Sequence, residues 1–254
     1  MRRLLLLVPL VVSCSSASPK EAKQTGELGG YVFAYRCHNP SDAFCDDGAT
    51  FAKDSLPIVA VGSTFRISYN YAEGKDAQGN KIPDNYVGSF GSGDRLEQVG
   101  STSGTETSQY VLRAKKPGFA ALLASIPASG QVPSGVVGDL LHLKIAKADH
   151  IEASGKITGA AGASFSVSAG GLTVGLSAAT GVVTLRAFVT LADKTPLAGA
   201  LPTAWTQTLT DVLKLTSDGS DNVASFDVKS FGTAVVHVVM GDVAADITVK
   251  LEAK

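Results

Sequence analysis

The sequence contains few cysteines, no long apolar run and no excess of basic charge. Three cysteines in 254 residues are too few for the disulfide framework of a small secreted domain. Its 22 basic and 23 acidic residues nearly balance, and no basic cluster indicates a nucleic-acid partner. The apolar run at residues 4–12 is shorter than the roughly 20 residues that a transmembrane helix needs. These absences favour an ordinary globular protein.

The first residues instead have the pattern of a secretory signal peptide. Arg2 and Arg3 precede the apolar run, and the small residue Ser13 follows it. The stretch from residue 11 to Cys14, Val-Val-Ser-Cys, resembles the lipobox of bacterial lipoproteins. This resemblance implies cleavage after Ser13 and lipidation of Cys14, and therefore a membrane partner reached through two or more acyl chains. The alternative is a plain signal peptide that happens to contain a cysteine.

Removal of residues 1–13 would leave 20 basic and 23 acidic residues, a net charge of −3. Residues 14–29 are polar and show no apolar periodicity, so we expect them to form a flexible tether that begins at Cys14. The lipoprotein resemblance places the mature protein in the cell envelope. Ser15, directly after Cys14, is compatible by that resemblance with sorting to the outer membrane.

Cys37 and Cys45 remain as an even pair once Cys14 is assigned to lipid. In an exported protein such a pair predicts a disulfide, and its short loop corresponds to about 2–3 kcal/mol of stabilisation. A metal site that adds His38, Asp46 and Asp47 is the alternative. The second pair of ligands that a tetrahedral zinc site requires is missing. We therefore predict a disulfide, no bound metal and no cofactor.

Short alternating stretches predict an all-β fold. Phe65, Ile67 and Tyr69 would share one face of a strand over residues 64–71. Residues 141–145 alternate in the same way, with His142 on the outer face. The uncharged segment between residues 156 and 186 also has period two. Turn signals at residues 170–171 and 180–181 predict antiparallel hairpins there.

The second half of the chain repeats the pattern of the first. In residues 118–145 and again in residues 232–251, a glycine opens an apolar strand and an alternating strand follows. Asp139 and Asp246 occupy matching positions just before the alternating strands. A repeat of about one hundred residues indicates two copies of one domain, because solenoid units are much shorter.

The second copy is similar to bacterial immunoglobulin-like (Big-type) domains. The similarity rests on a strand, an Asp-led turn, Trp205, a Gly-x-Ala-x-Val strand and a closing strand, at residues 185–191, 193–199, 205, 232–236 and 246–251. It implies two tandem immunoglobulin-like antiparallel β-sandwiches at residues 30–147 and 148–254. Trp205 is expected as a core anchor, and a stacking platform is the alternative.

No arrangement of residues indicates catalysis. The four histidines, at positions 38, 142, 150 and 237, accompany no Gly-x-Ser-x-Gly motif. The acidic stretch at residues 218–222 lacks the spacing of a calcium-binding EF-hand loop, so we predict a solvated turn. Tyr86 and Phe90 form the one candidate ligand loop, because glycines flank their aromatic rings.

These observations predict a lipid-anchored, non-enzymatic protein of the cell envelope. Its expected role is surface structure, adhesion or binding of an extracellular polysaccharide or protein. One alternative is a periplasm-facing docking subunit of an envelope assembly. The other is a divergent hydrolase or metal-dependent enzyme.

Overall fold

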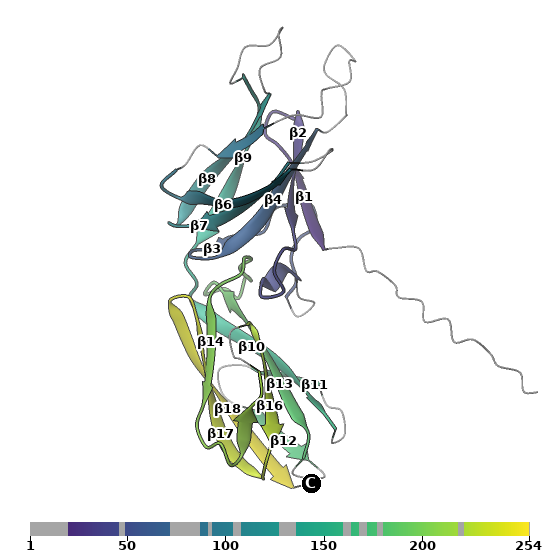
Figure 1. Ribbon diagram of the computed structural model, residues 1–254, viewed down its shortest axis with the longest axis vertical. Helices are drawn as coiled ribbons and strands as arrows, with labels where there is room; N and C mark the ends of the chain where they lie inside the picture. The colour runs from purple at the N-terminus through teal and green to yellow at the C-terminus, as the bar shows by residue number, and fades with distance from the viewer. Residues whose placement is uncertain are drawn as a thin grey trace, which may run out of the picture.

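The computed structural model describes residues 20–45, 49–71, 87–90, 93–103, 108–126, 136–159, 164–167, 172–176, 180–217 and 221–253. Within these ranges the chain forms β-strands and one short 3-10 helix, η1 (Ala43–Cys45), so the all-β prediction is confirmed. Figure 1 shows the strands as two sandwiches stacked end to end along the long axis of the molecule.

The first sandwich encloses an aromatic-rich core. One of its sheets has the strand order β1-β2-β4-β7-β6, and the other has the order β3-β9-β8-β5. Phe33, Tyr35, Phe65 and Leu112 are fully buried between them. Its strands are β1 (Glu21–Thr25), β2 (Tyr31–Arg36), β3 (Val59–Ala60), β4 (Thr64–Tyr71), β5 (Val87–Phe90), β6 (Leu96–Ser103), β7 (Ser108–Ala114), β8 (Gly118–Ile126) and β9 (Val136–Ala146).

The core of the second sandwich consists mostly of aliphatic side chains. Its sheets have the orders β11-β10-β13-β16-β15 and β12-β18-β17-β14, and Leu185, Phe226 and Val236 are fully buried. The strands are β10 (His150–Thr158), β11 (Ser164–Val167), β12 (Leu172–Leu176), β13 (Val182–Thr190), β14 (Thr203–Gln207), β15 (Leu213–Leu215), β16 (Val223–Val228), β17 (Gly232–Met240) and β18 (Val243–Ala253).

Both sandwiches have the strand order of the immunoglobulin fold. In the first, β2-β4-β7-β6 faces β3-β9-β8-β5, and in the second, β10-β13-β16-β15 faces β12-β18-β17-β14. The short strands β3 and β12 pair in parallel with the closing strands β9 and β18. Because β7, β8 and β9 take the places of β16, β17 and β18, the predicted internal repeat is confirmed.

The predicted hairpins between residues 156 and 186 are wrong. β11 pairs antiparallel with β10, but β12 pairs in parallel with β18 in the opposite sheet, and β13 returns to β10. Residues 170 and 171 lie outside the described ranges. Period-two alternation shows that a strand has two different faces, but it does not identify the neighbour with which the strand pairs.

The predicted tether at residues 14–29 is wrong from Glu21 onward. Residues 21–25 form the edge strand β1, which pairs antiparallel with β2, and Ala22 is fully buried. An edge strand is stabilised by backbone hydrogen bonds to its one neighbour and by burial of one face. It therefore needs few apolar residues, and the absence of a strong apolar pattern did not exclude it.

The predicted equivalence of Asp139 and Asp246 is wrong by one residue. Asp139 lies opposite Ala124 and is fully buried. Asp246 lies opposite His237, and its side chain is 68% exposed. A shift of one residue along a strand moves a side chain to the other face, so the two aspartates have different environments.

Candidate functional site at the junction of the two sandwiches

The predicted disulfide between Cys37 and Cys45 is present, with an S–S distance of 2.04 Å. It closes the segment between the end of β2 and η1. Phe44, inside this loop, is almost fully buried and packs edge-on against Tyr35, with 4.9 Å between the ring centroids. The loop therefore covers the end of the first sandwich that faces the second sandwich.

Trp205 lies in β14 and is 4% exposed. Its ring packs edge-on against Phe226, with centroids 6.4 Å apart, inside the core of the second sandwich. The indole Nε1–H donates a hydrogen bond to the backbone carbonyl of Asp221 at 2.7 Å. Burial and this hydrogen bond place Trp205 in the core rather than on a binding surface.

The candidate ligand loop at Tyr86 and Phe90 is described only in part, and ligand binding there stays a prediction. Phe90 is the last residue of β5 and lies opposite Leu122 of β8, so it belongs to a strand and not to a loop. Tyr86 lies outside the described residues, as does the predicted lipidation site Cys14. The sequence missed the strand because its flanking glycines are typical of turns.

His38, His142 and His237 each contact a different partner, and no two of them contact each other in these interactions. His142 Nδ1 lies 2.6 Å from Glu27, and His237 Nδ1 lies 2.7 Å from Asp246. His38 contacts the Arg66 guanidinium, and burial together with that positive charge lowers the pKa of His38. Within the described ranges, no group of three or more histidine, cysteine, aspartate and glutamate side chains is placed to hold a metal ion.

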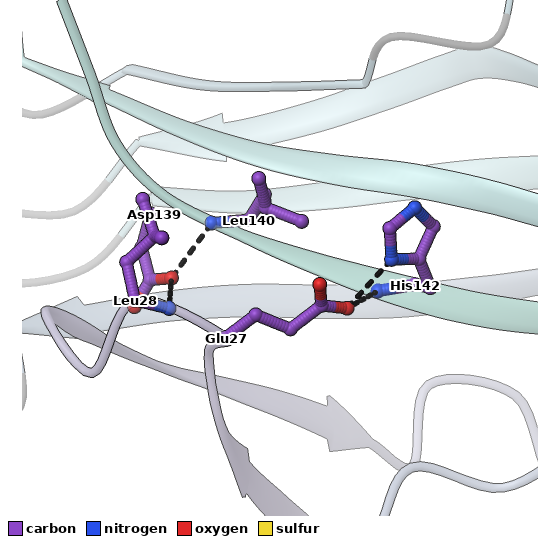
Figure 2. A network of polar contacts seen from close by, with 5 residues as sticks. All are labelled: Glu27, Leu28, Asp139, Leu140 and His142. Atoms are coloured by element: carbon purple, nitrogen blue, oxygen red, sulfur yellow. Dashed lines mark hydrogen bonds and ion pairs between the residues drawn. The ribbon is translucent and has the colours of Figure 1, made fainter.

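Figure 2 shows a polar network that fixes the β1–β2 turn to β9. The buried Asp139 carboxylate accepts backbone N–H groups from Leu28 at 2.8 Å, Tyr31 at 2.8 Å and Leu140 at 2.7 Å. Glu27 Oε1 accepts the backbone N–H of His142 at 3.0 Å and also contacts Nδ1 of the His142 ring. These interactions stabilise the first sandwich and occupy both oxygens of the buried Asp139 carboxylate.

The two sandwiches are joined by backbone hydrogen bonds. Ala198, from the loop between β13 and β14, donates to the carbonyl of Ile58 at 2.8 Å and accepts from Ala60 at 2.9 Å. Ala200 and Thr64 exchange a pair of bonds at 2.8 and 2.9 Å. Ala198 belongs to the first core and Ala60 to the second, so each sandwich completes the core of the other.

Asp42 is the buried charged residue of this junction, with 1% exposure. Its Oδ1 accepts the backbone N–H of Phe44 at 2.9 Å and that of Gly199, from the second sandwich, at 2.7 Å. Its Oδ2 accepts the hydroxyl of Tyr35 at 2.7 Å. Burial raises the pKa of Asp42, and burial together with the nearby carboxylate raises that of Tyr35.

Gly199 is required at its position by both conformation and space. Its φ of 102° lies in the region that favours glycine. A Cβ atom at this position would come within 2.0 Å of Ser63 Oγ, which itself donates to the carbonyl of Ala60 at 2.7 Å. The loop of the second sandwich can therefore approach the first sandwich this closely only through a glycine.

A second polar contact crosses the junction from the disulfide loop. Ser41 Oγ donates to Asp221 Oδ1 at 2.9 Å. Because the Asp221 carbonyl also accepts from Trp205, the loop is connected to the core of the second sandwich. A cleft of about 270 Å³ opens beside this contact, lined by Asn39, Ser41, Gly62, Thr64, Arg113, Ala200, Leu201, Pro202 and Asp221.

Sequence reasoning did not find the junction. The disulfide prediction identified the loop that carries Asp42, and Gly199 was recognised only as part of a turn. The two residues are 157 positions apart, and nothing in the local pattern of either one indicates the other. The position of Asp42 between two paired cysteines is the feature of the sequence that could have directed attention to the junction.

In the part of the chain that the structure describes, no helix has the length and apolar character needed to cross a membrane.

Comparisons with known proteins give no family assignment. No protein-family model matches the chain, and no curated protein matches it. Among solved structures, domains 5–6 of the S-layer protein SbsC align with 15% identity over 81% of this chain and 97% of that one, with a TM-score of 0.30. The Escherichia coli adhesin FdeC aligns with 17% identity over 79% of this chain and 62% of that one, with a TM-score of 0.27.

The D0-D1 domain of intimin aligns with 14% identity over 76% of this chain and 92% of that one, with a TM-score of 0.23. Structural similarities with TM-scores this low establish neither the fold nor the function of this chain. The immunoglobulin-like assignment rests on the strand order of this chain's own sheets.

Proposed function

We propose that the protein is a lipid-anchored, non-enzymatic component of the bacterial cell envelope, in which two immunoglobulin-like sandwiches act as one rigid spacer or adhesion module. The junction carries this proposal. Sandwiches joined only by a linker move independently, whereas here buried Asp42, backbone pairing at Ala198 and Ala200, and exchanged core residues fix their orientation. A rigid body of this kind suits a structural or adhesive role.

Anchoring is the first part of the proposal to test. Cells expressing the full chain would be grown with an alkyne-labelled fatty acid, and a Cys14→Ser variant would be the matched control. We expect label on the wild-type chain and its recovery with membranes. The control should lack label and leave the membrane fraction. Equal labelling of both chains, or of neither, would contradict lipidation at Cys14.

Exposure at the cell surface is the second part. Intact cells would be treated with proteinase K, and a C-terminal epitope tag would follow the second sandwich. Loss of the tag from intact cells would support a surface spacer or adhesin. Protection until the outer membrane is opened would instead support the periplasm-facing docking subunit, and the adhesion proposal would be withdrawn.

A further inference from the structure

We propose that the Cys37–Cys45 disulfide is a lock on the orientation of the two sandwiches, and that an exported dithiol reductant can open it without unfolding either sandwich. This regulation rests on the proposed function as a rigid two-sandwich body. The argument starts from the position of the disulfide, which closes a loop that lies outside both sheets of the first sandwich.

The contacts inside the loop point to orientation as its role. Of the residues between the two cysteines, Ser41 and Asp42 both bond to the second sandwich, through Asp221 and Gly199 respectively. Asp42 also forms an isolated β-bridge with Ala200. The loop therefore holds side chains from the first sandwich in position to bind the second.

The loop also fixes its own backbone at Ser41 and Asp42 from within. Asn39 Oδ1 accepts the backbone N–H of Ser41 at 2.9 Å, and the N–H of Cys45 donates to the carbonyl of Asp42 at 2.8 Å. Closing a loop by a covalent bond removes most of its alternative conformations. Opening the disulfide returns that freedom to Ser41 and Asp42, and their bonds across the junction weaken.

The remaining junction contacts explain why neither sandwich needs to unfold. Ala198 and Ala200 pair with Ile58 and Thr64, which are outside the disulfide loop. These backbone bonds and the exchanged Ala60 and Ala198 contacts persist when the disulfide opens. Reduction thus changes a locked junction into one held by fewer contacts, rather than separating the two bodies completely.

The chemistry is an ordinary thiol–disulfide exchange. Both cysteines are partly exposed. A thiolate of the reductant attacks one sulfur, the Cys37–Cys45 bond breaks, and a mixed disulfide forms with release of the other cysteine as a thiolate. The second thiol of the reductant then displaces the protein sulfur. The protein gains two electrons and two protons as two thiols, and the reductant becomes a disulfide.

Amide hydrogen exchange measured by NMR gives a residue-resolved test. The full mature chain would carry Cys14→Ser, so that Cys37 and Cys45 are its only cysteines, and it would be compared before and after treatment with dithiothreitol. The amide of Gly199 depends on Asp42 for its bond, whereas those of Ala198 and Ala200 bond to backbone carbonyls. We expect exchange at Gly199 to accelerate about tenfold or more, with Ala198 and Ala200 little changed.

Two outcomes would overturn the lock. Unchanged exchange at Gly199 after reduction would show that the disulfide does not hold the contact. Loss of protection throughout the β17–β18 or β4–β7 ladders would show that reduction unfolds a sandwich. An Asp42→Ala variant, kept oxidised, should show the fast Gly199 exchange that reduction produces. Slow exchange in that variant would also refute the proposal.

Access of the reductant is tested separately by alkylation and mass spectrometry. Dithiothreitol should generate two alkylatable thiols on the folded chain without denaturant, and a Cys37→Ser/Cys45→Ser chain should gain none. If reduction requires denaturant, the regulatory proposal fails. The fatty-acid labelling of Cys14 is unaffected by that result, so failure of the lock and failure of the proposed lipoprotein function are distinguishable.

Discussion

Asp42 Oδ1 accepts the backbone N–H of Gly199 at 2.7 Å, and this bond joins the two sandwiches across 157 residues of sequence. A buried carboxylate that lacked such partners would be strongly destabilising. Here all three of its acceptor contacts are made, two within the first sandwich and one to the second. The second sandwich therefore completes the hydrogen bonding of a residue that belongs to the first.

Gly199→Ala should weaken the junction. The new Cβ would meet Ser63 Oγ and would have to adopt a positive φ, so we expect a loss of about 2 kcal/mol or more in the free energy of unfolding. Urea denaturation followed by circular dichroism measures it. Gly93→Ala is the control, because an added Cβ there meets nothing within 4 Å. Equal stability of the two variants would contradict a close approach at Gly199.

Asp42→Asn should be tolerated far better than Asp42→Ala. An asparagine oxygen can still accept from Phe44 and Gly199, and its amide can donate to Tyr35, whose hydroxyl can either donate or accept. Alanine leaves two buried N–H groups and a hydroxyl without their acceptor, which we expect to cost about 3 kcal/mol or more. Urea denaturation of both variants at pH 7 measures the difference. Comparable losses would show that the charge itself is required.

The buried Asp42 carboxyl predicts that the free energy of unfolding depends on pH. Because burial raises the pKa of Asp42 above its ordinary value of 3.8, the folded chain holds this proton more tightly than the unfolded chain. The resulting contribution to stability is fully present below pH 3.8 and is lost as the pH rises through the raised pKa. The hydrogen bonds from Tyr35, Gly199 and Phe44, and then the charge of Lys20, oppose part of this rise in the pKa. Asp42→Asn should abolish this component of the stability profile, and an unchanged profile would contradict it.

Asp139 should respond to substitution differently from Asp42. All three of its partners are backbone N–H groups, from Leu28, Tyr31 and Leu140. An asparagine amide would place a donor against at least one of them, so Asp139→Asn should cost about 2 kcal/mol and approach the loss from Asp139→Ala. Thermal unfolding of both variants is the measurement. A fully tolerated asparagine would argue against this hydrogen-bond pattern.

The contact between Glu27 and His142 predicts a lowered pKa of Glu27, which NMR can measure. The hydrogen bond from His142 holds the pKa of Glu27 below its ordinary value of 4.5. The stabilising contribution of this exposed pair is therefore present above pH 4.5 and is lost as the pH falls through the lowered pKa. NMR titration of the Glu27 carboxyl carbon should show the low value in the wild type and a rise toward 4.5 in His142→Ala. Identical titrations would contradict the contact.

Trp205 offers both a prediction and a probe. Trp205→Ala should destabilise the second sandwich by about 3–5 kcal/mol, because it leaves a large cavity beside Phe226. Trp205→Phe should cost less, since it keeps a ring but loses the bond to the Asp221 carbonyl. Both are measured by urea denaturation. A loss below 1 kcal/mol for alanine would mean that the ring is not part of the core.

Trp205 is the single tryptophan of the chain, so its fluorescence reports on the second sandwich alone. In the wild type the fluorescence and circular dichroism transitions should coincide, because the junction couples the two bodies. In Gly199→Ala they should separate. Coincident transitions in both chains would leave no sign of weakened coupling and would count against the role assigned to Gly199.

The sequence by itself determined the strand-rich character, the repeat and the disulfide. Alternation at Phe65, Ile67 and Tyr69 reflects a sheet with one buried face, and that pattern is local. The pairing of Cys37 with Cys45 followed from there being two cysteines left once Cys14 was assigned to lipid, in a chain expected to be exported. Such features depend on residues close in sequence or on simple counting, and they need no knowledge of the packed structure.

Only the tertiary structure decided the strand partners, the edge strand β1 and the junction. β12 pairs in parallel with β18, and the polar residues 21–25 pair with β2, because the sheet that forms supplies free backbone groups at its edge. Asp42 and Gly199 meet only once both sandwiches have formed and packed end to end. Backbone groups are nearly the same at every residue, so the strand pairings leave no local pattern in the sequence, and the partner of the Asp42 side chain lies 157 residues away.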